Sequence, residues 1–112
     1  MTTLAQSKII REYPLPCGPE VVCYDFTGSW QVLRVEARFA KPNLYVLEDA
    51  VGPRTSVEFA VVNTNAPFDG ETVLADGNSY LGSYLVHVPT NVLHVFGPTS
   101  AQHAENAAAT PA

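Results

Sequence analysis

The sequence predicts an all-β fold, a single-domain antiparallel β-sandwich or small barrel of about seven strands with extended N- and C-terminal arms. Short runs rich in β-branched and aromatic residues recur every ~10–12 residues, and turn residues separate them. No helical period interrupts this series, and a chain of 112 residues makes one domain. We expect an arm at 1–7, a β domain at 8–97 and a flexible alanine-rich tail at 98–112.

The first strands follow from alternating apolar and polar positions. Strands of this kind are expected at 8–13, 20–26, 44–48 and 55–63. Pro14, Pro16 and Pro19 stop the first of them, because proline cannot donate a hydrogen bond to a ladder. Turns are expected at 41–43 and 51–54, where proline stands beside asparagine or glycine.

The strand expected at 30–39 has the clearest alternation. Its expected inward face consists of Leu33, Val35, Ala37 and Phe39. Arg34, Glu36 and Arg38 alternate on the other side, which indicates a solvated face or a polar contact with a neighbouring strand. Trp30 opens this strand, and an exposed Trp–Arg patch is typical of a protein–protein hot spot.

The longest irregular stretch runs from 64 to 77. Pro67 and the two Asp-Gly pairs at 69–70 and 76–77 are turn signals within it. Connections of this length in a compact domain are often contact loops, so Phe68 and Asp69 are candidate partner contacts.

Residues 78–97 form the expected centre of the sheet, a hairpin whose two apolar arms are joined by Pro89-Thr90-Asn91. Neither arm has a clean polar side, so we expect both faces to be covered. In a two- or four-residue loop register, His87 and His94 face each other and supply half of a zinc site. A three-residue register separates them, because one step of slip exchanges the faces. Two structural sheet histidines are the favoured interpretation, and no metal or cofactor is expected.

No catalytic residue is expected either. The candidate carboxylates are Asp25, Asp49, Asp69 and Asp76. None lies in a calcium-binding loop, and turn chemistry explains the two that precede glycine. Ser83, Cys17 or Cys23 could pair with a histidine, but the chain has no nucleophile elbow and no glycine-rich phosphate loop. The two cysteines are expected to be reduced, semi-buried thiols, because no export signal is present.

Composition narrows the classes of partner. Only 15% of residues are charged while 46% are hydrophobic, and a soluble chain so poor in charge often hides apolar surface against neighbours. The net charge of −5 and six scattered basic residues argue against a nucleic-acid partner. No apolar run is long enough to span a membrane, so we expect the protein in the cytoplasm of the producing cell or in a virion. The aromatic side chains Trp30, Tyr24, Tyr80 and Tyr84 could form a platform for a sugar or a partner, but filling the β core is favoured.

Several short motifs occur in a fixed order between residues 8 and 97. They are Tyr13-Pro14-Leu15, residues 32–36, 44–47, 57–61 and 63–68, the YLGSY run at 80–84, and His94-Val95-Phe96. In this order and spacing the chain resembles a catalogued domain of unknown function found in small phage and bacterial proteins. The resemblance implies a compact β domain that recurs in phage-related genomes, with no assigned catalytic residue. The C-terminal tail and Pro89-Thr90-Asn91, where a glycine-rich turn is more typical, depart from that pattern.

We therefore expect a non-enzymatic β interaction module, and most concretely a phage structural or accessory protein such as a capsid-decoration or other virion component. A regulatory binder of a host protein is the alternative, and a metal- or carboxylate-dependent enzyme is a third. The expected partner is a second copy of the chain or another protein, with no nucleic acid, membrane or cofactor. The expected contact residues are Trp30, Arg34, Arg38, Phe68 and Asp69.

Overall fold

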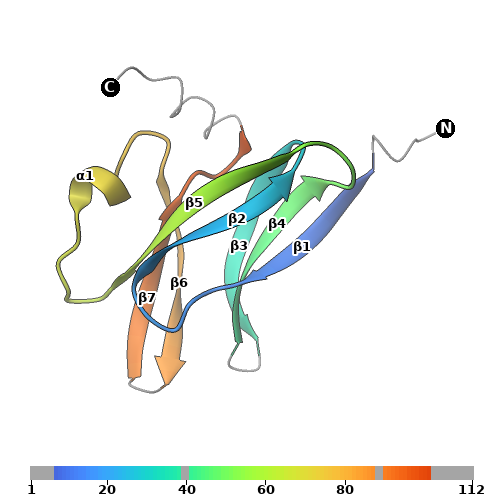
Figure 1. Cartoon of the computed structure of the whole chain (residues 1–112). Coiled ribbons are helices and arrows are strands. Elements are labelled where there is room, and N and C mark those ends of the chain that lie inside the picture. The colour runs from blue at the N-terminus through green and yellow to red at the C-terminus, as the bar shows by residue number, and fades with distance from the viewer. Residues whose placement is uncertain (1–6, 39–40, 88–89, 102–112) are drawn as a thin grey trace.

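A computed structural model describes residues 7–38, 41–87 and 90–101 as two packed antiparallel sheets (Figure 1). The three-stranded sheet has the order β1-β4-β3, with β1 at Lys8–Pro14, β4 at Lys41–Asp49 and β3 at Trp30–Arg38. The four-stranded sheet has the order β2-β5-β7-β6, with β2 at Glu20–Thr27, β5 at Arg54–Asn63, β7 at Thr90–Gly97 and β6 at Ser79–His87. The predicted all-β fold with seven antiparallel strands is confirmed.

One short helix, α1 (Gly70–Val73), interrupts the loop between β5 and β6. Figure 1 shows it beside the four-stranded sheet and away from β1, β3 and β4. In the part of the chain that the structure describes, no helix combines the length and apolar character of a membrane span.

The main core lies between the sheets and is built on aromatic rings. Phe26 is fully buried, and its ring centroid lies 4.8 Å from that of Trp30, 5.1 Å from Tyr13 and 5.8 Å from Phe59. Aliphatic side chains from the central strands fill the remainder, among them Leu44, Val46, Leu93 and Val95. Each fully buried side chain of this size contributes about 1.5–3 kcal/mol relative to its exposed state, so alternation in the central strands fixes which face turns inward.

The side chains of Leu33 and Ala37, two positions of the inward face predicted for 30–39, are exposed. A β-bulge between Val32 and Arg34 shifts the register against β4, and Leu33 is 42% exposed instead of buried. Val32 and Val35 pack against the core, because a bulge places an extra residue between two inward positions. Phe39 lies outside the described residues.

The hairpin was predicted to be central, but only one of its two strands, β7, lies inside the four-stranded sheet. β7 lies between β5 and β6, whereas β6 is an edge of its sheet. Its backbone approaches β3 through Gly82, where a Cβ would lie 3.0 Å from Cβ of Val35. This close contact brings one edge of each sheet together and closes that side of the sandwich.

Two predicted turns lie elsewhere. β4 already begins at Lys41, and Pro42 lies opposite Ala37 near the strand's start, so residues 41–43 are not a turn. β7 begins at Thr90, opposite His87, so Pro89-Thr90-Asn91 is not the hairpin loop, and residues 88–89 lie outside the described chain.

The ends of the chain are described in part. Ser7 accepts a hydrogen bond from the amide of Ala50 at 2.8 Å, so it continues β1 along β4. Thr99 accepts one from the amide of Val32 at 2.8 Å, and Ser100 forms a bridge with Gln31, so this part of the predicted tail pairs with β3. Residues 1–6 and 102–112, which make up the rest of the predicted arm and tail, lie outside the described residues.

Candidate functional site

The loop that follows β5 is organised by hydrogen bonds of its own. The carboxylate of Asp69 accepts from the amide of Glu71 at 3.1 Å and from the hydroxyl of Thr72 at 2.7 Å, which caps the first turn of α1. These bonds, with that from Thr72 first, hold the pKa of Asp69 below its usual range. The side-chain amide of Asn78 donates to the carbonyl of Val73 at 3.1 Å and ties down the other end.

This loop folds back over the outer face of the four-stranded sheet. Val73 is buried against Ala60 and Val62 of β5, and Phe96 of β7 packs on the same small cluster. The ring of Phe68 lies 6.1 Å from that of Phe96 and is 44% exposed. A second, smaller apolar core therefore forms outside the sandwich, with Phe68 at its margin.

A groove of about 430 Å³ lies between this loop and the start of β2. Its lining is mostly apolar and consists of Pro19, Glu20, Val21, residues 60–63, Ala66, Pro67, Phe68, Asp69, Thr72 and Val73. Val21 of β2 and Phe68 of the loop both line the groove and are exposed. The charged groups in the lining, Glu20 and Asp69, are acidic, and no lysine or arginine is among the lining residues described.

The groove lies beside an unpaired length of strand edge. The amide of Gly28 donates to the carbonyl of Pro53 at 2.8 Å, so Gly28 and Pro53 form a hydrogen-bonded pair of the β2–β5 ladder. In an antiparallel ladder, every second residue of β2 before Gly28 is then hydrogen-bonded to β5, and the residues between them are not. Thr27, Asp25, Cys23 and Val21 consequently turn their backbone groups away from β5. Two of them contact side chains of the other sheet: the amide of Thr27 donates to Glu48 at 2.7 Å, and the carbonyl of Asp25 lies 3.3 Å from the Tyr13 hydroxyl oxygen. Within the described residues, no strand pairs with β2 at Val21 and Cys23.

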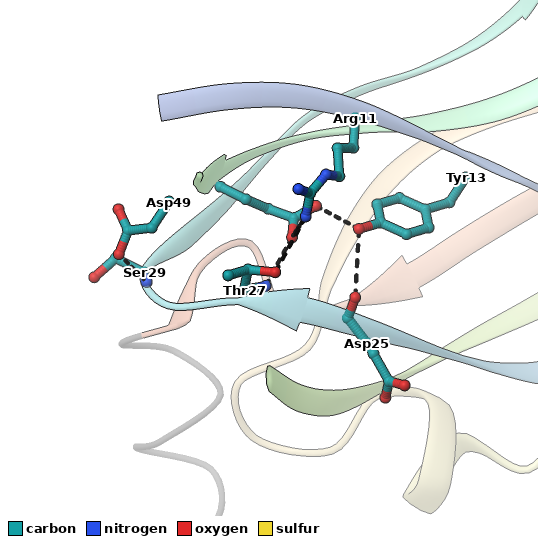
Figure 2. A network of polar contacts seen from close by, with 7 residues as sticks. Arg11, Tyr13, Asp25, Thr27, Ser29 and Asp49 are labelled. Atoms are coloured by element: carbon teal, nitrogen blue, oxygen red, sulfur yellow. Dashed lines mark hydrogen bonds and ion pairs between the residues drawn. The ribbon is translucent and has the colours of Figure 1, made fainter. Parts of the chain in front are cut away.

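Glu48 is the polar centre of the seam between β1 and β2. Its side chain is fully buried, and it accepts hydrogen bonds from the amide of Thr27, from the hydroxyl of Tyr13 and from Arg11 at 3.4 Å. Figure 2 shows Arg11, Tyr13 and Thr27 converging in this network. Burial, followed by the bond to Glu48, raises the pKa of Tyr13 to about 12. Both carboxylate oxygens are occupied, so this cluster joins the two sheets.

Glu48 was not among the predicted site residues, although the alternation along β4 indicates its position. Leu44, Val46 and Glu48 share one face of β4 by simple alternation, and the first two are the most deeply buried aliphatic residues of that strand. A carboxylate in the same row is therefore directed into the core, where it needs a partner.

The facing pair of His87 and His94, one of the registers considered from the sequence, does not form. In the observed register His87 lies opposite Thr90 and His94 lies opposite Ser83, so the two histidines are far apart along the ladder. The hairpin connection is two residues long but is centred two residues earlier in the chain than the register that would place His87 opposite His94. In the described residues, no three His, Cys, Asp or Glu side chains are grouped to hold a metal ion, and Cys17 and Cys23 are separate, exposed thiols, not the semi-buried ones expected.

His94 instead lies between two hydroxyl groups. Its Nε2 is 2.7 Å from Thr64 Oγ1, and its Nδ1 is 2.9 Å from the Tyr80 hydroxyl. The Thr64 hydroxyl donates to the carbonyl of Val92 at 3.1 Å, so its oxygen accepts from Nε2 of His94. These contacts anchor the start of the 64–77 loop to β7.

The five predicted contact residues do not form one surface. Trp30 is 5% exposed and packs on Phe26, so the prediction of an exposed Trp–Arg patch is wrong; an indole at the start of an inward-facing row gains more from burial. Arg34 is exposed on the outer face of the three-stranded sheet, 3.5 Å from Glu36. The backbone of Arg38 belongs to β3, and its side chain lies outside what the structure describes. Phe68 and Asp69 do come together, at the groove.

The other aromatic residues divide between core and surface. Tyr84 is buried and Tyr24 is half-buried in the main core, as favoured from the sequence, whereas Tyr80 is exposed beside His94 and Phe96.

Comparison with known proteins identifies a family. The model of a family described as a domain of unknown function, DUF7352, matches residues 6–106. No curated protein and no solved structure matches the chain.

Proposed function

This chain belongs to the DUF7352 family of domains of unknown function, and we propose that it is a non-enzymatic module that binds another protein through the groove beside β2. The observation that carries the proposal is the groove itself, an apolar hollow between Phe68 and Val21 next to an unpaired stretch of strand edge. Exposed apolar side chains gathered in a concave surface are a common feature of protein-binding sites.

The chemistry of the groove specifies the kind of segment that fits. An extended segment can pair its backbone with Val21 and Cys23, which adds a strand to the β2 edge. Strand addition directs alternate side chains toward the hollow, and an apolar side chain matches its lining. Glu20 and Asp69 favour a lysine or arginine next to that side chain. The proposed ligand is therefore an extended protein segment with an apolar residue flanked by a basic one.

A selection from a random peptide library tests this specificity. We expect the selected peptides to combine an apolar residue with a neighbouring lysine or arginine, and to bind the full chain in a fluorescence anisotropy titration. Phe68→Ala should weaken their binding by about tenfold or more, because it removes one wall of the groove. The matched control is Leu74→Ala, since Leu74 is exposed just after α1 but does not line the groove.

Two results would overturn the groove proposal. One is a selection without any enriched sequence that binds the protein. The other is a set of binders whose affinity is the same for Phe68→Ala and Leu74→Ala, because those peptides would be bound elsewhere.

For the biological setting, we propose a bacteriophage structural or accessory protein, such as a decoration protein of the capsid or another virion component. The sequence resemblance to small phage and bacterial domains and the low charge content support this setting. Mass spectrometry of purified virions from a phage that encodes the chain tests it, with the expected result a fixed number of copies per particle. Absence from purified particles would exclude the virion role and leave a regulatory binder of a host protein as the alternative.

A further inference from the structure

A sandwich of two open sheets has four strand edges, and three of them are covered to different degrees. The edge of β3 pairs with Thr99 and Ser100 and lies against β6 through Val35 and Gly82, which also shields β6. Along the edge of β2, the outward backbone groups of Thr27 and Asp25 contact the side chains of Glu48 and Tyr13, whereas Val21 and Cys23 have no strand beside them within the described residues. Among the described residues, no strand pairs with the outer edge of β1 between Lys8 and Glu12.

The hydrogen bonds to β4 show which groups this edge presents. Ala50 donates to the carbonyl of Ser7 at 2.8 Å, and Leu15 donates to that of Pro42 at 3.1 Å. Because hydrogen-bonded pairs alternate along an antiparallel ladder, the odd-numbered residues of β1 face β4. Lys8, Ile10 and Glu12 therefore turn both their N–H and C=O groups outward.

The side chains of the same three residues lie on the outer face of the sheet. On this face Lys8 forms an ion pair with Asp49 of β4. Ile10 lies between Lys8 and Glu12 on the same face and is 61% exposed. Glu12 is exposed and has no ion pair within the described residues. An exposed isoleucine on an unprotected edge strand is a feature that many proteins avoid, because it promotes pairing with another chain.

We propose that β1 pairs antiparallel with β1 of a second copy, in the register that places Ile10 opposite Ile10. This register places Lys8 of each copy opposite Glu12 of the other, and every outward N–H and C=O of Lys8, Ile10 and Glu12 finds a partner. Registers shifted by two residues place Lys8 opposite Ile10 or Pro14, so they lose the charge match and leave backbone groups unpaired. The edge is thus self-complementary about a two-fold axis, as a symmetric dimer requires.

The resulting assembly is a continuous six-stranded sheet, β3-β4-β1 from each copy, with the two four-stranded sheets on the same side. Contact over one short strand is smaller than the ~1,200 Å² of a standard interface, so the association is weak and depends on protein concentration. The dimer uses a different edge from the groove and does not rest on the proposed function.

Sedimentation equilibrium of the full chain over a wide concentration range tests the pairing. The wild type is expected to shift from monomer to dimer as concentration rises. Ile10→Pro is expected to weaken the dimer by about tenfold or more, because it removes an outward N–H from the centre of the interface. The same change removes no hydrogen bond to β4, since residue 10 faces away from that strand, and circular dichroism checks that the variant is folded.

A charge exchange tests the register. Lys8→Glu alone and Glu12→Lys alone each place like charges opposite one another, so each variant is expected to dimerise less than the wild type. An equimolar mixture of the two restores both opposite-charge pairs in a heterodimer, so dimer is expected to reappear. If Lys8→Glu fails to fold beside Asp49, the Ile10→Pro measurement still decides the proposal.

Three outcomes would overturn the inference: a wild-type chain that remains monomeric at millimolar concentration, an Ile10→Pro dimer as strong as the wild type, or no recovery in the mixture of folded variants. A monomeric wild type would mean that the charges of Lys8 and Glu12 keep the edge from pairing. Phe68→Ala should leave the dimer unchanged, and Ile10→Pro should leave peptide binding unchanged, so failure of either proposal is distinguishable from failure of the other.

Discussion

The carboxylate of Glu48 takes the place of the backbone pairing that β1 and β2 do not make. It lies on β4, accepts from the amide of Thr27 on β2, and is approached by Arg11 and Tyr13 from β1. A buried charge is costly unless its oxygens are satisfied, and here each of them has a donor. One side chain therefore joins three strands from two sheets.

Removing this carboxylate should destabilise the fold strongly. Glu48→Ala leaves a cavity and removes the acceptor of the hydrogen bonds from Thr27, Tyr13 and Arg11. We therefore expect a loss of about 3–5 kcal/mol in the free energy of unfolding. Glu48→Gln keeps an acceptor for Thr27 and should cost less, about 1–3 kcal/mol. Urea denaturation monitored by Trp30 fluorescence measures both.

Glu36→Gln is the matched control, because Glu36 forms an exposed pair with Arg34 at 3.5 Å. Its loss should cost less than about 1 kcal/mol. Equal effects at positions 36 and 48 would show that burial of Glu48 does not contribute to the seam.

Trp30 was predicted to be exposed beside Arg34 and Arg38, but its side chain is buried. The charged positions that follow it suggested an exposed ring, but alternation is not continuous along β3 because of the bulge at Leu33. Trp30 lies opposite Glu48, whose row points into the core. A bulge has no reliable sequence signal, so the face of each residue before it could not be assigned from those after it.

At the level of elements, Gly82 allows β6 to approach β3. It has a φ of 149°, in the region that favours glycine, and follows a register shift against β7. A Cβ at this position would press on Val35 from 3.0 Å. The short distance between the two edges therefore requires a residue without a side chain.

Gly82→Ala should consequently destabilise the sandwich by about 1–3 kcal/mol, through backbone strain and crowding together. Thermal unfolding by circular dichroism measures the change in midpoint. Gly70→Ala is the control, since its new methyl group would meet only the tip of Leu74, at 4.0 Å. A Gly82→Ala melting temperature no lower than that of Gly70→Ala would contradict this account of the contact.

The strands themselves could be predicted, and their pairing could not. All seven follow from apolar runs between turn residues, with bounds within a few residues of those observed. The hairpin register depended on the position of the connection. It lies two residues earlier than a His87–His94 pair requires, so His87 pairs with Thr90. Phe68 and Asp69 were selected as loop residues, but the groove also needs Val21 from β2, which only the tertiary fold brings there.

At the scale of the whole molecule, three tyrosine hydroxyls hold the connection after β1 and the seam beside it. Tyr24 and Tyr84 donate to the carbonyls of Pro14 and Pro16, and Tyr13 donates to Glu48. Burial raises the pKa of all three, to about 12 for Tyr13 and Tyr24. The folded protein therefore keeps these protons at a pH where the unfolded chain releases them.

The free energy of unfolding should accordingly fall as pH rises from about 10 to about 12, because the unfolded state binds fewer protons than the native state in that window. Below pH 10 both states are protonated, and the contribution of the three hydroxyls is fully present. Urea denaturation across this range measures the slope. Tyr13→Phe should be less stable at neutral pH but lose stability less steeply, and an unchanged slope would show that Tyr13 does not titrate differently in the two states.

The place of β7 in the four-stranded sheet has a consequence for biosynthesis. β7 is the last strand of the domain to leave the ribosome, yet it lies in the middle of its sheet, between β5 and β6. Until Gly97 has been synthesised, β2 and β5 form only a two-stranded ribbon, and β6 has no strand to pair with. Folding of this sheet therefore follows translation of nearly the whole domain, and β6 must remain unpaired in the nascent chain until β7 has been made.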